Sequence, residues 1–299
     1  MPKKMKTWVK ALTLSLLALT QTACETVQTT QAGVVGINRP QQMAVSRESV
    51  EQQSAQAYLQ LRQEASQKRT LNTDPLMLER VQRITNRLIA QVAVFRPDAV
   101  KWKWEVSVIQ SDDVNAFCMA GGKMAVYTGL IQKLQITDDE LAAVMGHEIA
   151  HALREHVREQ MSDQQFLGIG AAVGGALLGV DPRLAQNGAQ ILIGLPHSRR
   201  AEVEADQMGL ELAARAGYDP RAAITLWQKM NRIGGSKPPE FLSTHPSPET
   251  RAQDLARVAD IVMPLYAATQ TQKTTPATGQ GGSKPAAAPN SPRVMPILQ

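Results

Sequence analysis

The chain has 299 residues, of which 43% are hydrophobic, enough for one large domain or two small ones with a sizeable core. Its formal charge of +5 comes mostly from the first ten residues, which contain Lys3, Lys4, Lys6 and Lys10 and no acidic residue. Without residues 1–23 the chain has 28 basic and 27 acidic side chains, a net charge of +1. Nucleic-acid binding needs a basic stripe on the folded domain. The sequence shows none, so nucleic acid is not expected as a partner.

Residues 1–23 have the layout of a secretory signal peptide, with a Lys-rich start, an apolar stretch and a small residue before Cys24. A cysteine at that point resembles the lipobox of bacterial lipoproteins, whose thiol is acylated, so we expect a lipid anchor at Cys24. Gln21 stands where an aliphatic residue is usual, and the alternative is an ordinary cleaved signal on a soluble periplasmic protein. Glu25 replaces the Asp that retains lipoproteins at the inner membrane. This favours the periplasmic side of the outer membrane.

Composition divides the rest of the chain into three parts. Residues 24–45, rich in Gln, Thr and Gly, are expected to form a flexible tether, and residues 46–267 one domain. Residues 268–299 are expected to be a disordered polar tail, because they cannot bury enough apolar surface to offset the entropy of ordering. Residues 166–180 are apolar but shorter than the roughly 20 residues that span a bilayer. A buried or interfacial helix pair is expected there. Cys118 has no disulfide partner if Cys24 is acylated.

The predicted elements of the domain come in a mixed order. A polar helix is expected over 46–68, and a second helix over about 75–96, opened by an Asp-Pro pair. Apolar and polar residues then alternate over 102–108, the period of a half-buried strand. Two short strands follow at 115–119 and 123–127. The fold class is therefore α+β and mainly helical, with a small antiparallel sheet ahead of the helices that carry the chemistry.

A capping box, Thr137-Asp-Asp-Glu140, opens the helix that contains His147-Glu148-Ile-Ala-His151. Two histidines four residues apart lie on one helix face, so both imidazoles can reach one ion. Glu148 leans toward the same cleft, where it can take a proton from a water that attacks a peptide bond. Imidazole and carboxylate ligands in an open tetrahedral site favour zinc. We expect one zinc ion per chain.

Spacing alone leaves two interpretations open for the third metal ligand. The metzincin pattern requires Gly and His where this chain has Arg154 and Val157, which excludes that branch. His156 is five residues past His151 and is expected to be a surface histidine or one that contacts a ligand from behind. Glu202 and Asp206 are four residues apart in Ser-Arg-Arg-Ala-Glu-Val-Glu-Ala-Asp, so one could bind the metal while the other hydrogen-bonds a ligating histidine. The alternative is a solvated acidic helix face.

Four motifs in order resemble the HtpX, BepA and LoiP family of bacterial zinc metallopeptidases. They are the run Asp113–Gly122 (DVNAFCMAGG), His147–His151, Ser198–Asp206, and His245-Pro-Ser with Arg251. The resemblance covers roughly residues 75–260. It implies a zincin fold of the gluzincin type, and it implies three zinc ligands and a general base, which are His147, His151, Glu202 and Glu148 respectively.

The same resemblance implies roles for residues around the ligands. Asp206 would hydrogen-bond a ligating histidine, and His245 would lie near the metal as a regulatory ligand or a transition-state donor. His245 or Arg251 would steady the oxyanion. The alternative for His245 is a loop residue before a helix. Residues Asn115, Ala116 and Phe117 would belong to an edge strand to which an extended substrate adds.

Function follows from the resemblance as an expectation. HtpX carries transmembrane helices and BepA a tetratricopeptide array, and LoiP-like outer-membrane lipoproteins have the closest architecture. The expected activity is cleavage of unfolded or misassembled envelope proteins, with the outer-membrane assembly machinery as a further partner. The alternative is a chaperone or assembly factor with a latent or structural zinc site. His197 is treated as a substitution without an assigned function.

Overall fold

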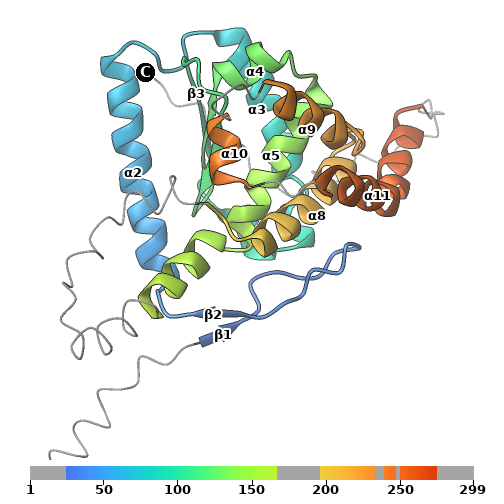
Figure 1. Cartoon of the computed structure of the whole chain (residues 1–299), viewed down its shortest axis with the longest axis horizontal. Coiled ribbons are helices and arrows are strands. Elements are labelled where there is room, and N and C mark those ends of the chain that lie inside the picture. The colour runs from blue at the N-terminus through green and yellow to red at the C-terminus, as the bar shows by residue number, and fades with distance from the viewer. Residues whose placement is uncertain (1–24, 167–195, 234–238, 247–249, 275–299) are drawn as a thin grey trace, which may run out of the picture.

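The computed structural model describes residues 25–166, 196–233, 239–246 and 250–274. The expected signal peptide, Cys24 and most of the apolar run 166–180 lie outside these residues. Figure 1 shows a mainly helical domain around a small sheet. Its elements are β1 (Glu25–Val27), β2 (Gln41–Met43), α2 (Arg47–Gln67), α3 (Pro75–Ile89), the short 3-10 helices Val92–Val94 and Pro97–Lys101, β3 (Glu105–Ile109), β4 (Ala116–Met119), β5 (Lys123–Tyr127), α4 (Thr128–Leu134), α5 (Asp138–Leu153), α8 (Arg199–Arg215), α9 (Ala222–Ile233), α10 (Glu240–Thr244) and α11 (Arg251–Thr274).

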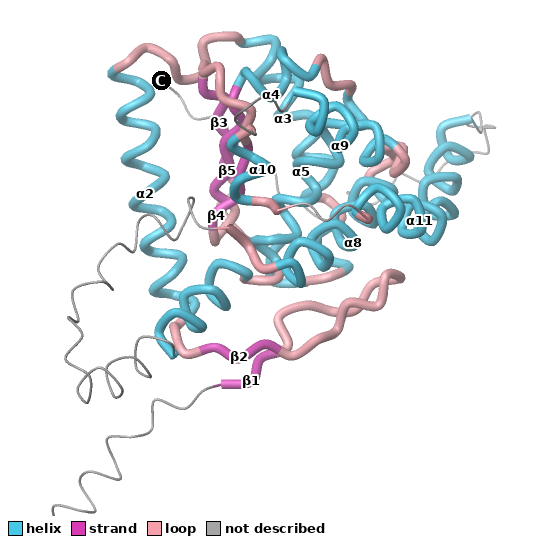
Figure 2. Tube along the Cα trace, in the orientation of Figure 1, coloured by secondary structure: helices cyan, strands magenta, loops and turns pink. Residues whose placement is uncertain are grey.

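The main sheet is mixed, which corrects the expected antiparallel sheet. Its strand order is β3-β5-β4, with β4 antiparallel and β3 parallel to β5 (Figure 2). Gly121 and Gly122 both have positive φ and form the tight β4–β5 turn. The chain leaves β3, forms β4 at the far edge and returns with β5 between them. The pairing of β3 with β5 is non-local. The alternation of apolar and polar residues within each strand could therefore not predict whether the two strands run parallel or antiparallel.

Alternation along β4 separates two packing layers. Ala116 and Cys118 belong to the main core with α5, whereas Phe117 and Met119 pack in a second cluster with Tyr58 of α2. In Figure 2, α2 lies on one side of the sheet and α5 on the other. The expected polar helix over 46–68 is therefore confirmed, and it covers the second face of the sheet.

Helices α5 and α8 meet at a pair of glycines. A Cβ atom on Gly146 would lie 2.7 Å from the Gly209 carbonyl oxygen, and one on Gly209 would lie 2.6 Å from the His147 nitrogen. Only glycine allows this close backbone contact. The start of α5 is fixed by the predicted capping box, in which Glu140 accepts from the Thr137 amide at 2.8 Å and Thr137 from the Glu140 amide at 3.2 Å. The crossing brings the first turn of α8 close to the histidines of α5.

The expected tether is a folded hairpin, which corrects the prediction for residues 24–45. Strands β1 and β2 pair antiparallel, and Thr29, Thr30, Gln41 and Met43 are buried. The Gln41 amide donates to the Arg154 carbonyl at 2.8 Å. Polar residues are ordered here because their side chains satisfy buried polar groups of the domain rather than because they form an apolar core.

The C-terminal helix also differs from expectation. The α11 helix continues to Thr274, past the expected domain end at residue 267, and residues 275–299 of the expected tail lie outside the described chain. Within the described residues, no helix combines the length and apolar character needed to cross a bilayer.

Candidate metal centre

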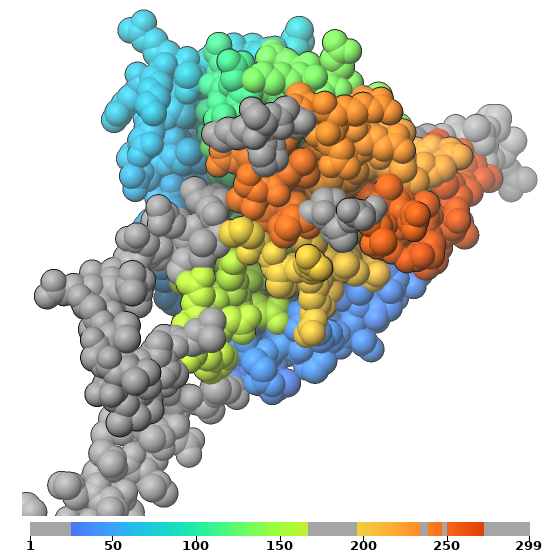
Figure 3. Space-filling model, viewed as in Figure 1, coloured from blue at the N-terminus to red at the C-terminus, as the bar shows by residue number. Residues whose placement is uncertain are grey.

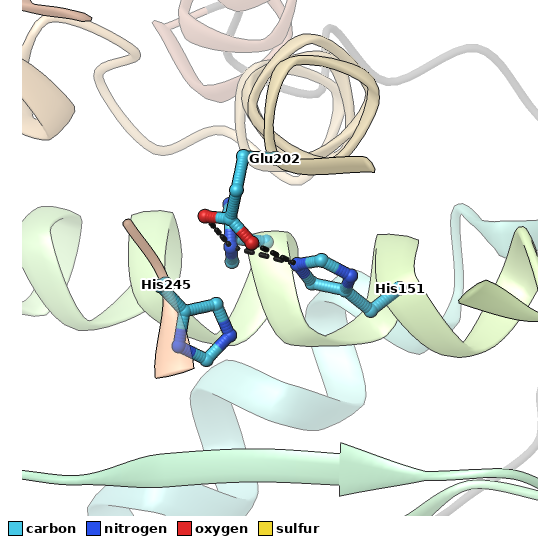
Figure 4. Close-up of side chains that lie close together, drawn as sticks. His151, Glu202 and His245 are labelled. Atoms are coloured by element: carbon cyan, nitrogen blue, oxygen red, sulfur yellow. Dashed lines mark hydrogen bonds and ion pairs between the residues drawn. The ribbon is translucent and has the colours of Figure 1, made fainter. Parts of the chain in front are cut away.

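Three predicted ligands converge between α5 and α8. The Nε2 atoms of His147 and His151 lie 3.0 Å apart on one face of α5. Glu202 points down from the first turn of α8, with its oxygens 3.3 Å from His151 Nε2 and 3.6 Å from His147 Nε2. Figure 4 shows the Glu202 carboxylate directed at His151 from the opposite helix. All three side chains are buried.

These donors fit a zinc ion. Ligands about 2.1 Å from a tetrahedral zinc lie about 3.4 Å from one another, which agrees with the separations of 3.0, 3.3 and 3.6 Å found here. One Glu202 oxygen, Oε1, is buried without a hydrogen-bond partner. Burial raises the pKa of Glu202 to about 8, although Arg251 opposes the shift. A cation between these atoms would stabilise the carboxylate and occupy the unpaired oxygen.

Asp206 supports His147 from behind, as predicted. Its Oδ1 accepts a hydrogen bond from His147 Nδ1 at 2.9 Å, which leaves the lone pair on Nε2 facing the other donors. Burial lowers the pKa of His147, so the imidazole is held in its neutral, ligating form.

Arg251 lies behind Glu202 and Asp206. Its guanidinium donates to Glu202 Oε2 at 3.0 Å and to Asp206 Oδ1 at 2.7 Å, and it lies over the Trp227 ring with its central carbon 3.4 Å from the ring centroid. Both terminal nitrogens are thus directed at carboxylates behind the ligands. These contacts fit a residue that positions Glu202 and Asp206, and the oxyanion role stays a prediction.

Glu148 lies on the other side of the histidines. It is buried, and its Oε1 has no hydrogen-bond partner. Burial raises the pKa of this carboxyl well above its usual value, the charge of Glu202 adds to the shift, and a backbone hydrogen bond from Cys118 opposes it. A raised pKa suits a group that must accept and then release a proton near neutral pH.

His245 is the fourth donor of the cluster. One donor atom each from His147, His151, Glu202 and His245 lies within 4.8 Å of all the others. His245 caps the C-terminus of α10, where its ring stacks on Phe241 at 4.2 Å. Its Nε2 has no hydrogen-bond partner and lies 3.4 Å from Glu148 Oε1. His245 thus lies beside the other three donors, and its role there stays a prediction.

The predicted edge strand lies where expected. Strand β4 is at the edge of the sheet, and its Cys118 backbone reaches Glu148. Ala116 faces α5 and the Phe117 side chain faces α2, while Asn115 is half-buried just before the strand. The backbone of β4 at Cys118 is therefore next to Glu148. Addition of a substrate strand here stays a prediction.

Three residues near the ligands were underestimated from the sequence. His156 is buried, with its Nδ1 2.8 Å from His151 Nδ1, so the alternative in which it contacts a ligand holds and the surface alternative does not. Glu204, which the alternative placed on a solvated face, is 4% exposed and contacts His156. His197 stacks on the His151 ring at 4.1 Å. The contacts of His156 have no local sequence signal, because they depend on a turn after α5.

The fold and this donor set define a zinc metallopeptidase with a His-Glu-x-x-His helix and a glutamate ligand from a later helix. The profile of peptidase family M48 matches residues 75–259, more than half of the chain. The protein belongs to peptidase family M48.

Curated relatives come from both mitochondria and bacteria. The chain is 39% identical over 173 residues to the mitochondrial metalloendopeptidase OMA1 of Arabidopsis thaliana, a match that covers 57% of this chain and 35% of that protein. It is 34% identical over 177 residues to the mitochondrial metalloendopeptidase OMA1 of Homo sapiens, covering 54% and 33%. It is 30% identical over 210 residues to the beta-barrel assembly-enhancing protease of Escherichia coli K12, covering 65% and 41%. The matched region thus spans about a third to two fifths of these relatives.

Proposed function

We propose that this protein is a zinc-dependent endopeptidase of the bacterial envelope that cleaves misfolded or misassembled proteins. One observation carries the catalytic part of this proposal. Glu148 lies beside three convergent metal donors with a buried carboxylate oxygen that has no hydrogen-bond partner. A buried carboxylate oxygen without a hydrogen-bond partner is typical of a group that acts on substrate.

The residues divide the work of hydrolysis. His147, His151 and Glu202 would hold a zinc ion, which would supply Lewis-acid polarisation of the scissile carbonyl and of a water molecule. Glu148 takes a proton from the attacking water and delivers it to the nitrogen of the leaving amine. Asp206 keeps the proton of His147 on Nδ1 throughout.

The substrate class rests on the edge strand. A polypeptide that adds to β4 by backbone hydrogen bonds is recognised by its extended conformation more than by its side chains. Unfolded and misassembled proteins offer such segments. The name of the beta-barrel assembly-enhancing protease supports outer-membrane assembly as the setting, with the assembly machinery as a partner.

The proposed location is inferred from residues 1–23, which have the layout of a signal peptide, and from Cys24. A Lys-rich start, an apolar stretch and Ala23-Cys24 support an acylated Cys24 on the periplasmic side of the outer membrane, the architecture of LoiP-like lipoproteins. Labelling with a radioactive fatty acid and membrane fractionation test this. Wild-type protein should be labelled and Cys24→Ser should not. A soluble, unlabelled wild-type protein would favour the periplasmic alternative.

Glu148→Gln tests the peptidase proposal. The amide keeps the size of the side chain and cannot accept the proton, so zinc content should stay at one ion per chain while cleavage of an unfolded protein such as reduced casein falls by at least about 100-fold. Undiminished cleavage by the variant would refute the role of Glu148. A wild-type chain that binds zinc and cleaves nothing would refute the peptidase proposal.

A second function, a chaperone or assembly factor with a latent or structural zinc site, is favoured by His245. Its unpaired Nε2 completes a set of four protein donors, and a structural zinc site has four. His245→Ala separates the two functions. Loss of zinc from the variant would support the structural site, whereas retained zinc with increased cleavage would show that His245 restrains an active peptidase.

A further inference from the structure

The turn after α5 changes the direction of His156. In an uninterrupted helix, five residues correspond to a rotation of about 140°, which would direct His156 away from the metal side of His151. The helix stops at Arg154, and Glu155 adopts the left-handed conformation with φ 54°. A new helix covers 156–166. His156 therefore returns to His151, with ring centroids 4.8 Å apart and planes at 72°.

The turn is held in place by arginines. A left-handed conformation is unfavourable for a residue with a Cβ atom and persists only where the surroundings fix it. The Glu155 carboxylate pairs with Arg96 at 2.7 Å, Arg158 at 2.7 Å and Arg47 at 2.8 Å. Glu155 is itself buried. These three ion pairs compensate its charge and fix the conformation that places His156.

A chain of hydrogen bonds runs from His151 to a carboxylate. His151 Nδ1 lies 2.8 Å from His156 Nδ1, and His156 Nε2 lies 3.2 Å from Glu204 Oε2. Glu204 also accepts from the Arg154 guanidinium at 2.8 and 2.9 Å. Glu204 accepts from Arg39 Nε at 2.6 Å as well. A guanidinium only donates, so Glu204 takes part in all of these contacts as an acceptor.

The direction of each hydrogen bond follows from this acceptor. His156 must donate its Nε2 proton to Glu204. A neutral imidazole donates through one ring nitrogen and accepts through the other, so the Nδ1 of His156 is an acceptor. The proton between the two Nδ1 atoms then belongs to His151. This leaves the His151 lone pair on Nε2, the atom that faces Glu202 and His147.

We propose that His156 and Glu204 are positioning residues that fix the tautomer and orientation of His151 for metal binding. The arrangement matches the one at His147, where Asp206 accepts directly from Nδ1. Each ligating histidine thus has its own carboxylate, and at His151 a second imidazole lies between the two. Such partners typically change metal affinity by 10 to 100-fold when removed. This inference rests on the zinc site of the proposed function.

Zinc affinity of the purified full chain, measured by competition with a chromogenic chelator, tests the inference without any substrate. His156→Leu removes both hydrogen bonds and should weaken zinc binding about 10 to 100-fold. Glu204→Gln keeps the shape and removes the charge, and it should weaken binding about 10-fold. His156→Asn places an amide oxygen near the former Nδ1, can still accept from His151, and should recover most of the affinity lost in His156→Leu.

Ser162→Ala is the matched control for a merely structural role. Ser162 lies on the same helix as His156, is fully buried, and accepts from the amides of Ala44 and Val45. It has no contact with a metal donor in the described chain. Its variant should loosen the same packing and leave zinc affinity within about twofold. Thermal unfolding of the metal-free variants identifies any that fail to fold. If His156→Leu does not fold, the zinc affinities of His156→Asn and Glu204→Gln still test the positioning role.

A spectroscopic readout adds to the affinities. The visible spectrum of the cobalt-substituted protein reports the ligand field, so it should change in His156→Leu and be restored in His156→Asn. Zinc affinities of all four variants within twofold of wild type, with unchanged cobalt spectra, would overturn the positioning role while leaving the zinc site intact. A wild-type chain that binds no zinc would instead overturn the site itself, and this inference with it.

Discussion

The two ligating histidines are supported from different parts of the molecule. Behind His147, Asp206 and Arg251 come from α8 and α11, and both lie within the region matched by family M48. Behind His151, the chain of contacts passes through His156 and Glu204 to residues before position 75. One side of the site is therefore built within the family domain, whereas the other is continuous with the N-terminal hairpin.

Arg39 makes that second connection. It donates to Glu204 Oε1 and to Glu159 Oε1, both at 2.6 Å, from the loop before β2. Figure 3 shows this N-terminal segment, in blue, on the surface beside α8. A metal ligand can therefore depend on a segment whose own sequence carries no metal-binding pattern. Four measurements test whether the supports of His147 and His151 differ in this way.

The largest effect is expected at the ligand that both sides share. Glu202→Ala removes the donor that faces both histidines, and zinc affinity should fall by more than about 100-fold, beyond the usual range for outer partners. Metal analysis after dialysis checks this. Val203→Ala, the next residue on α8 and exposed, is the control and should keep its zinc. Full zinc occupancy in Glu202→Ala would mean that His245 can replace it.

The second-largest loss of zinc affinity is expected when Asp206, the carboxylate in direct contact with His147, is removed. Asp206→Ala leaves His147 Nδ1 without its acceptor and Arg251 with one partner fewer, so zinc affinity should fall about 10 to 100-fold. Chelator competition measures it. Asp254→Ala on α11, where the carboxylate contacts Thr250 and Arg257, should change nothing. If Asp206→Ala were weaker in effect than Glu204→Gln, the support at His151 would be the more important of the two.

A smaller effect is expected where the hairpin joins the site. Arg39→Ala removes two ion pairs that are partly exposed to solvent, so the melting temperature should fall by about 2–4 °C and zinc affinity by less than about threefold. Calorimetry and chelator competition measure the two quantities. Arg221→Ala, which breaks an exposed pair with Asp219, serves as the control. A zinc loss as large as in Asp206→Ala would show that the two sides do not differ.

The smallest effect is expected in the pH dependence of the stability that Arg39 contributes. Burial raises the pKa values of Glu159 and Glu204, but hydrogen bonds outweigh it and lower both below the usual 4.5. They come from Arg39 and Gln41 at Glu159, and from His156 and Arg39 at Glu204. Groups with a lowered folded pKa stabilise the fold above the unfolded pKa and lose that contribution as pH falls. The difference in melting temperature between wild type and Arg39→Ala should therefore be constant above about pH 5 and shrink below 4.5. A difference that grows in acid would contradict these ion pairs.

Local patterns predicted much of the site. The capping box of α5, the spacing of His147 and His151, and the paired Glu202 and Asp206 are contacts within one helix turn, and the structure confirms their geometry. The parallel pairing of β3 depends on residues about 18 positions away, and periodicity within a strand carries no such information.

Other features could not be predicted for a different reason. The left-handed turn at Glu155 has neither Gly nor Asn, the usual signals for positive φ, and its stability comes from Arg47, Arg96 and Arg158. The hairpin is ordered by polar contacts such as Gln41 to Arg154 that span more than a hundred residues. The composition of a segment does not reveal which distant groups will form hydrogen bonds with its polar side chains.

The folded hairpin also limits the reach of the domain. A flexible tether over residues 25–45 could extend roughly 70 Å from an anchor at Cys24. Glu25, the residue that follows the proposed acylation point, already belongs to strand β1. An acylated Cys24 would then hold the peptidase domain against the bilayer surface rather than let it sample the width of the periplasm. Proteins that are still at the membrane would be cleaved in preference to those that have diffused away.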